Sequence, residues 1–224
     1  REHPCSSTRG PHRDIPGIDT KTSDLFAFFD NEFNFNVEET VALMGAHSIG
    51  QLSSENSGVH GPNGWVLNKD VLDNDYYVEL IGGMQPHDDL ETVVEQAPPW
   101  VREVEENRDN PFPRKHVWVA MPVLDNEPKK IVMLNVDVAI VRDLNENNMD
   151  RHGKVSCDFL ERLGPSPRCP HAAQSIHFAK AYKQDQAKWL EDFDKVMTKM
   201  ITTGYSESEC MGDVCKLEPL LTTN

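Results

Sequence analysis

The sequence lacks the features that mark several classes of protein. No apolar run is long enough to cross a bilayer, which takes about 18 residues or more, so we expect no membrane-spanning segment. Basic residues are few, because 22 Lys and Arg stand against 37 Asp and Glu, a formal net charge of −15. Nucleic-acid binding relies on clustered Lys and Arg that contact phosphate, so this charge disfavours a nucleic-acid partner. Apolar residues still make up 38% of the 224 residues, which favours a folded chain.

Cysteine is also scarce, and no Cys-x-x-Cys pair with the spacing of a zinc finger occurs. Cys157 with Cys169, and Cys210 with Cys215, lie in loop-like sequence where local disulfides are expected, which leaves Cys5. An odd cysteine in an oxidising compartment favours a bridge to another chain. We therefore expect a secreted, extracellular protein with disulfides. The alternative is a reduced intracellular protein with five inert thiols.

Two helices are predicted near the start of the chain. Residues 1–18 are rich in Pro, Gly, Arg and His, which predicts an extended arm. From Asp19 to Phe33 apolar residues recur at spacings of three and four, as in an amphipathic helix. Asn36 and Glu39 form a capping-box pattern that begins a second helix. Glycines on both sides of His47 indicate that this helix ends at or near the histidine.

The middle of the chain predicts loops with a few short elements. Residues 51–70 are rich in glycine and indicate a loop, and Asp73–Ile81 predicts a short helix. The acidic stretch 84–114 holds five prolines, which is typical of a surface insertion. Two β-like runs, His116–Met121 and Lys130–Asn135, are separated by turn residues and predict a hairpin.

The last third of the chain predicts one long helix. Residues 145–172 are loop-rich and are expected as a second insertion. A broad apolar stripe then predicts a helix from about Gln174 to Thr203, ended by Gly204. We expect a mainly α-helical fold with a small β-hairpin. Residues 19–204 would form the domain, and residues 205–224 an irregular tail.

His47 is the first candidate for chemistry. A histidine at the end of a helix can hold a metal from one side, and iron in haem needs an axial imidazole whose opposite ring nitrogen is anchored. Composition alone leaves His47 as one of nine histidines. The run Val41-Ala-Leu-Met-Gly-Ala-His-Ser-Ile-Gly50, however, resembles the proximal-histidine motif of the plant, fungal and bacterial haem peroxidase superfamily.

Further segments resemble the same family in the same order along the chain. Ser57–Trp65 is similar to the Ser-Gly-Phe-x-Gly-Pro-Trp loop of ascorbate and cytochrome c peroxidases, with two residues added before the Trp. Leu72–Tyr77 resembles the Phe-Asp-Asn-x-Tyr-Phe start of a helix in that family. Ile131–Asp137 resembles the segment that carries the proximal Asp, and Lys188–Gly204 the last core helix. The resemblance implies the proximal half of the haem peroxidase fold.

The resemblance also implies a haem b cofactor and a role for each matching residue. His47 would be the ligand of the haem iron. Asp137 would accept the Nδ1–H of His47 and so lower the reduction potential of the iron. Trp65 would stack near His47. Two alternatives stay open, since Trp65 would also suit an ordinary core position and Asp137 a capping or turn position.

A cation site beside the proximal helix is a further implication of the resemblance. By position, Ser48, Asn68 and Asp73 would offer oxygen atoms to K⁺ or Ca²⁺, which are hard ions that prefer oxygen ligands.

Peroxide chemistry in this family needs residues that the sequence lacks. An acid–base His and an Arg stand in an Arg-x-x-Phe/Trp-His motif on a helix well before the proximal His. No segment before His47 matches that motif. We expect a longer precursor cut before Arg1, and a second chain that carries the distal half, bridged to this one through Cys5. Hydrogen peroxide and a small reducing donor would be the substrates.

Two other classes of function stay open. The first is a non-catalytic, peroxidase-like protein that binds haem or serves a structural or storage role. The second is an acidic Ca²⁺-binding matrix protein unrelated to redox chemistry.

Overall fold

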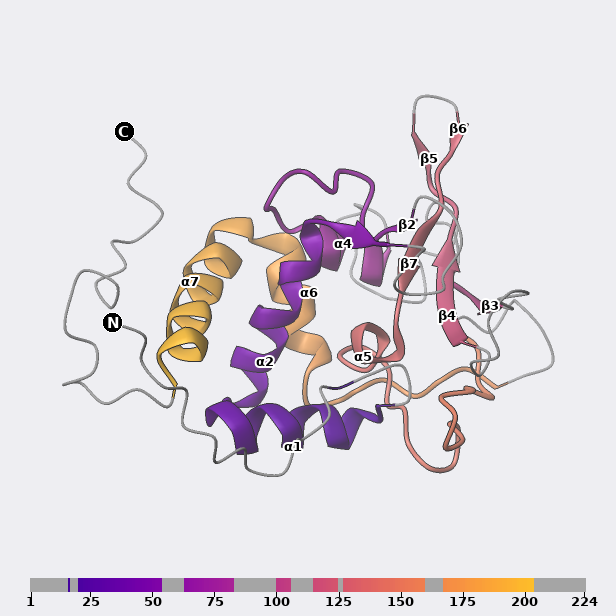
Figure 1. The fold of residues 1–224 in the computed structure, drawn as a ribbon, viewed down its shortest axis with the longest axis horizontal. Helices are drawn as coiled ribbons and strands as arrows, with labels where there is room; N and C mark the ends of the chain where they lie inside the picture. The colour runs from indigo at the N-terminus through magenta and orange to yellow at the C-terminus, as the bar shows by residue number, and fades with distance from the viewer. Residues whose placement is uncertain are drawn as a thin grey trace, which may run out of the picture.

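The computed structural model describes residues 16, 20–53, 63–82, 100–105, 115–124, 127–159 and 167–203. Figure 1 shows a group of helices on one side and a β-sheet on the other. The described helices are α1 (Thr22–Phe33), α2 (Val37–Met44), η1 (Gly45–Ser48), α4 (Asp75–Ile81), α5 (Asn135–Val138), α6 (Ile176–Gln184) and α7 (Gln186–Thr202). The mainly α-helical character expected from the sequence is confirmed. None of the described helices has the length and apolar character needed to cross a membrane.

The start of α2 follows the predicted capping pattern. The Asn36 side chain accepts a hydrogen bond from the Glu39 backbone N–H at 2.8 Å, and the Glu39 carboxylate accepts one from the Asn36 N–H at 2.8 Å. Together these bonds satisfy two backbone donors that a helix start would leave open. After Met44 the chain tightens into the 3₁₀ turn η1, which contains His47. The predicted position of His47 at the end of the second helix is confirmed.

The single long helix predicted from about Gln174 to Thr203 is wrong. The structure has two helices, α6 and α7, which meet at Asp185. The backbone of Asp185 is extended (φ −135°, ψ 92°), and its carboxylate accepts from the Lys188 N–H at 2.9 Å, capping α7. The apolar stripe continues through both helices, so periodicity alone does not reveal the break.

The sheet is larger than the small hairpin that was expected. Its strand order is β1-β2-β7-β4-β3, and a separate pair, β5 and β6, extends from it (Figure 1). The predicted hairpin is present as β4 and β7, which pair antiparallel, whereas β2 pairs parallel with β7. The bounds are β1 (Gln51–Leu52), β2 (Asn63–Gly64), β3 (Val101–Glu105), β4 (Lys115–Ala120), β5 (Val123–Leu124), β6 (Glu127–Pro128) and β7 (Ile131–Met133).

The missed strands have a physical explanation. β1 and β2 have two residues each, which is too short for a periodic pattern. β3 lies inside the acidic stretch 84–114, which was expected as a surface insertion, yet it pairs with β4 along five residues. Trp100, just before β3, is 3% exposed and donates from its indole N–H to the Glu79 carbonyl at 3.0 Å. Part of that stretch therefore belongs to the sheet and the core.

Disulfides are described for one of the two predicted pairs. Cys157 and Cys169 are bonded, as expected from their loop-like surroundings. The predictions for Cys5, Cys210, Cys215 and Gly204 lie outside the described residues, as do those for the arm, Pro16 excepted, and for the tail. The irregular stretch 145–172 contains isolated β-bridges in its described part but no helix or strand.

Candidate functional site

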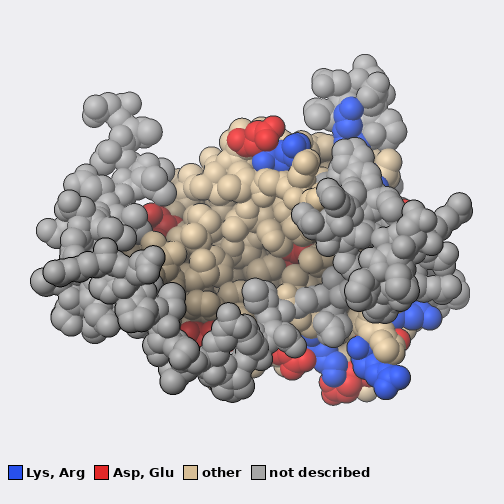
Figure 2. Space-filling model, in the orientation of Figure 1, with Lys and Arg blue, Asp and Glu red and all other residues tan. Residues whose placement is uncertain are grey.

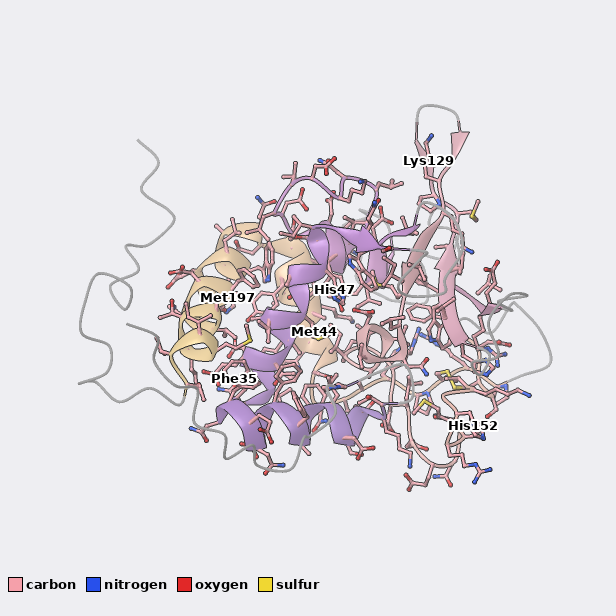
Figure 3. The ribbon with its side chains drawn as sticks, in the orientation of Figure 1. Phe35, Met44, His47, Lys129, His152 and Met197 are labelled. Atoms are coloured by element: carbon pink, nitrogen blue, oxygen red, sulfur yellow. A yellow bond between two sulfur atoms is a disulfide. The ribbon has the colours of Figure 1, made fainter. Side chains whose placement is uncertain are left out.

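His47 lies near the middle of the molecule, where α2 ends (Figure 3). Two hydrogen bonds fix the last turn of α2. The Tyr77 hydroxyl donates to the Val41 carbonyl at 2.7 Å, and the Trp189 indole N–H donates to the Ala42 carbonyl at 3.1 Å. Gly45 begins η1 against the same two aromatic side chains, and a Cβ there would fall within 2.6 Å of both. Helices α4 and α7 thus set the position of the histidine.

The structure brings His47 and Asp137 together across 90 residues of sequence. The Nδ1 atom of His47 lies 2.7 Å from Oδ1 of Asp137. Asp137 comes from α5, directly after strand β7, and its side chain is completely buried. A buried carboxylate against imidazole favours the tautomer in which Nδ1 carries the proton and donates it. That tautomer leaves the lone pair on Nε2.

Asp137 also accepts two other hydrogen bonds. The Tyr76 hydroxyl donates to Oδ1 at 3.1 Å, and the Leu134 backbone N–H donates to Oδ2 at 2.7 Å. Burial, followed by the charge of Asp137, raises the pKa of Tyr76 well above its usual value, so the phenol stays protonated as a donor. Three donors therefore satisfy this buried carboxylate.

Tyr76 is the site residue that sequence reasoning missed. It stands in the Leu72–Tyr77 run that resembles the family motif, but nothing in the spacing indicated where its hydroxyl points. Its ring also meets the His47 ring edge-on, with centroids 6.1 Å apart and planes at 76°. The hydroxyl of a buried Tyr usually has a hydrogen-bond partner. The Tyr in this predicted helix is therefore the signal that could have directed a search for an acceptor such as Asp137.

Trp65 packs flat against His47. The ring centroids are 3.9 Å apart and the planes differ by 3°. Trp65 itself is 8% exposed. It follows β2, which pairs with β7, so the strand that precedes Asp137 also positions the segment that carries Trp65. The two additional residues before Trp65 therefore leave its ring in contact with the histidine.

The outer side of His47 is accessible. Its side chain is 30% exposed, although Asp137 behind it is fully buried. No hydrogen bond to Nε2 comes from the residues that the structure describes. Figure 2 shows that the middle of one face, over α2 and its neighbours, carries few charged side chains, and that Lys, Arg, Asp and Glu gather mainly around its edge. An imidazole held from behind, with a lone pair outward, is chemically suited to an axial ligand of iron.

The candidate cation ligands are less well assembled. Ser48 is fully buried, and its hydroxyl has no hydrogen-bond partner within the described ranges. Asp73 accepts from the Asp75 N–H at 3.0 Å, just where α4 begins, and Asn68 is exposed. No hydrogen bond among the described residues joins any two of the three. Nor do those residues contain a cluster of three or more His, Cys, Asp or Glu side chains suited to a metal ion.

Comparison with known proteins points to haem peroxidases. A Mycosarcoma maydis protein named "Putative heme-binding peroxidase" is 27% identical over 187 residues, 84% of this chain and 41% of that protein. A Debaryomyces hansenii protein of the same name is 27% identical over 180 residues, 80% of this chain and 28% of that protein. A Cryptococcus neoformans var. grubii protein named "Cytochrome c peroxidase, mitochondrial" is 23% identical over 194 residues, 87% of this chain and 36% of that protein.

These similarities cover only part of each relative. No protein-family model matches the chain. The chain spans less than half the length of each of these three relatives, at identities below 30%. Over most of its length, the chain is a distant relative of proteins named as haem peroxidases.

Proposed function

We propose that this chain supplies the proximal, haem-ligating part of a haem peroxidase. The observation that carries the proposal is the buried Asp137 carboxylate, 2.7 Å from Nδ1 of His47. In this proposal His47 binds the iron of haem b through Nε2, and Trp65 stacks behind the ligand. Haem, when bound, would supply the redox chemistry with hydrogen peroxide. The names of the relatives support the same cofactor.

The chain's own residues would tune that ligand. Asp137 would draw the proton of Nδ1 toward itself, which would make Nε2 a stronger electron donor and would lower the reduction potential of a bound iron. Tyr76 and the Leu134 N–H hold the carboxylate in place and share its charge. Trp65 covers one face of the imidazole and fixes the plane of the ring. The weakly charged middle of the face in Figure 2 would suit an apolar macrocycle.

Cleavage of peroxide would need an acid–base His and an Arg. No segment before His47 matches the motif that carries these two residues. We propose that the distal His and Arg belong to another polypeptide segment, whether a separate chain or another part of a longer protein. Hydrogen peroxide and a small reducing donor would be the substrates. The Cys157–Cys169 disulfide supports an oxidising, extracellular location, where Cys5 would be available to bridge two chains.

A K⁺ or Ca²⁺ ion beside His47 is a lesser part of the proposal. The buried Ser48 hydroxyl, which has no partner among the described residues, supports a ligand at that position. Asn68 and Asp73 would supply further oxygens.

The proposal is tested by haemin titration of His47→Ala. We expect the purified chain to bind haemin in a one-to-one ratio with a shifted Soret band. The variant is expected to lose this retention while its far-ultraviolet circular dichroism stays the same, because iron loses its axial ligand. His177→Ala, which removes an exposed histidine of α6, is the matched control and should bind normally.

The outcomes separate the candidate functions. Full haem retention by His47→Ala would overturn the proposal. Haem binding without peroxide turnover, in an assembly that native mass spectrometry finds to contain this chain alone, would favour the non-catalytic haem-binding alternative. Calcium binding without any haem spectrum would favour the matrix-protein alternative.

A further inference from the structure

Arg142 is a buried guanidinium whose hydrogen-bonding capacity is mostly unused. It lies shortly after α5 and is 1% exposed. Its Nη2 donates to the Phe159 carbonyl at 3.0 Å, and its central carbon lies 4.5 Å from the centre of the Phe159 ring. Its Nε and Nη1 find no acceptor within the part of the chain that the structure describes. Because a guanidinium carries five N–H donors, most of them are left unsatisfied.

Among the described residues, the charge of Arg142 also has no counterion. A buried charge that lacks a partner is strongly unfavourable, and a guanidinium resists losing its proton. The two acidic side chains closest to it along these segments are engaged elsewhere. Asp158 forms an ion pair with Arg102, and Asp143 accepts from the Asn145 amide at 2.8 Å. No carboxylate among the described residues pairs with Arg142.

A second guanidinium adds to the positive potential at this place. Burial, and then the charge of Arg168, lower the pKa of Arg142 to about 9, so it stays charged at neutral pH. Arg168 also lies against the exposed His171, with Nη2 and Nε2 2.9 Å apart. A positive charge nearby makes a buried guanidinium that has no counterion still less favourable.

The walls of the site are fixed by covalent and backbone bonds. The Cys157–Cys169 disulfide closes the segment that carries Phe159 and Arg168. Backbone hydrogen bonds tie the next residues to the Arg142 segment, from the Asp143 N–H to the Pro170 carbonyl at 2.8 Å and from the Ala172 N–H to the Val141 carbonyl at 3.1 Å. The guanidinium is therefore held in place and cannot turn to solvent.

We propose that Arg142 is the centre of a buried binding site for a small monovalent anion, of the size of chloride or formate. The anion would accept from the Nε–H or Nη1–H donors and compensate the charge of Arg142. Burial of the side chain excludes a large anion, and a single negative charge is enough to balance Arg142. This site is independent of the proposed haem function.

The same anion would steady the segment that carries Asp137. The Arg142 N–H bonds to the Val138 carbonyl at 2.8 Å, and the Arg142 carbonyl accepts from the Thr22 hydroxyl at 3.1 Å. Arg142 thus joins α5 to the start of α1, and a stable guanidinium would keep these two helices in their relative positions.

Thermal unfolding of the full chain, without added haemin, tests the proposal. Chloride replaces gluconate at constant ionic strength, so that general screening stays the same. We expect Tm to rise saturably by roughly 2–4 °C, because a ligand that binds only the folded state stabilises it by mass action. The line width of ³⁵Cl nuclear magnetic resonance should broaden with the protein and sharpen when bromide or formate competes.

Two variants locate the effect. Arg142→Met puts an unbranched apolar side chain in place of the guanidinium and removes its charge, and should abolish both the chloride-dependent rise and the line broadening. Arg151→Met removes an exposed Arg and should behave like the parent chain. If the parent chain shows neither signal, or if Arg142→Met retains them, the site does not exist. Should Arg142→Met fail to fold, Arg142→Lys, which keeps the charge but lacks the Nε–H and Nη1–H donors, should weaken both signals, and unchanged signals would overturn the proposal.

Discussion

Asp137 and Arg142 are two buried charges on one short stretch of chain, and their surroundings are opposite. Asp137 is fully buried and accepts hydrogen bonds from His47, Tyr76 and the Leu134 N–H. Arg142 is equally buried, but within the described ranges it has one acceptor, the Phe159 carbonyl, and otherwise an aromatic ring. A charge surrounded by donors is stable within the protein alone, whereas an unsatisfied one needs something from outside. Burial of a charge therefore does not by itself reveal its role.

The largest expected effect comes from removing the satisfied charge. Asp137→Ala should lower the free energy of unfolding by about 3–5 kcal/mol, because it leaves three hydrogen-bond donors without their buried acceptor. Chemical denaturation at low salt measures the change. Arg142→Met should alter the same quantity by only about 1 kcal/mol or less, since replacing an unpaired buried charge by an apolar side chain is often neutral.

An equal loss of unfolding free energy in Asp137→Ala and Arg142→Met would contradict the proposed difference between the two buried charges. If Asp137→Ala is too unstable to purify, Asp137→Asn keeps the volume and two of the acceptor contacts. It should still lose more stability than Arg142→Met.

Glu79 of α4 is a partly buried acid whose pKa is shifted by its surroundings. Burial, with a smaller effect from Asp75, raises the pKa of Glu79 from 4.5 to about 7. Between these values the folded state holds a proton that the unfolded state has lost, so the free energy of unfolding falls as pH rises and levels off above pH 7. Glu79→Gln should remove that fall and be more stable than the parent at alkaline pH, by about 1–3 kcal/mol.

The pH dependence of the difference is the test for Glu79. Thermal unfolding of the parent and Glu79→Gln should diverge as pH rises through this window. Glu146→Gln, which changes an exposed acid, should follow the parent throughout. A constant difference between parent and Glu79→Gln at every pH would mean that the glutamate does not titrate in this range.

Local patterns predicted the helices and the site residues better than they predicted the sheet. The capping box at Asn36 and the hairpin of β4 and β7 depend on residues that are close in sequence, so the sequence alone predicted them. The contact of His47 with Asp137 could be expected only through the resemblance, since no local rule joins residues so far apart. Strand β3 is stabilised by its pairing with β4, and the break at Asp185 is stabilised by one side-chain cap. Neither composition nor periodicity predicts such contacts.

The sequence did not predict the direction of the Tyr76 hydroxyl either. The contact of this hydroxyl with Asp137 gives the prediction with the smallest expected effect. Tyr76→Phe removes one of three donors to Asp137 and should cost about 1 kcal/mol of stability. With less of its charge shared, Asp137 would pull harder on the His47 proton, so the reduction potential of bound haem should fall. Asp137→Asn should move that potential upward instead, because the imidazole loses its anionic partner. Potentiometric titration compares the two, and a shift of the same sign in both would show that Tyr76 does not act through Asp137.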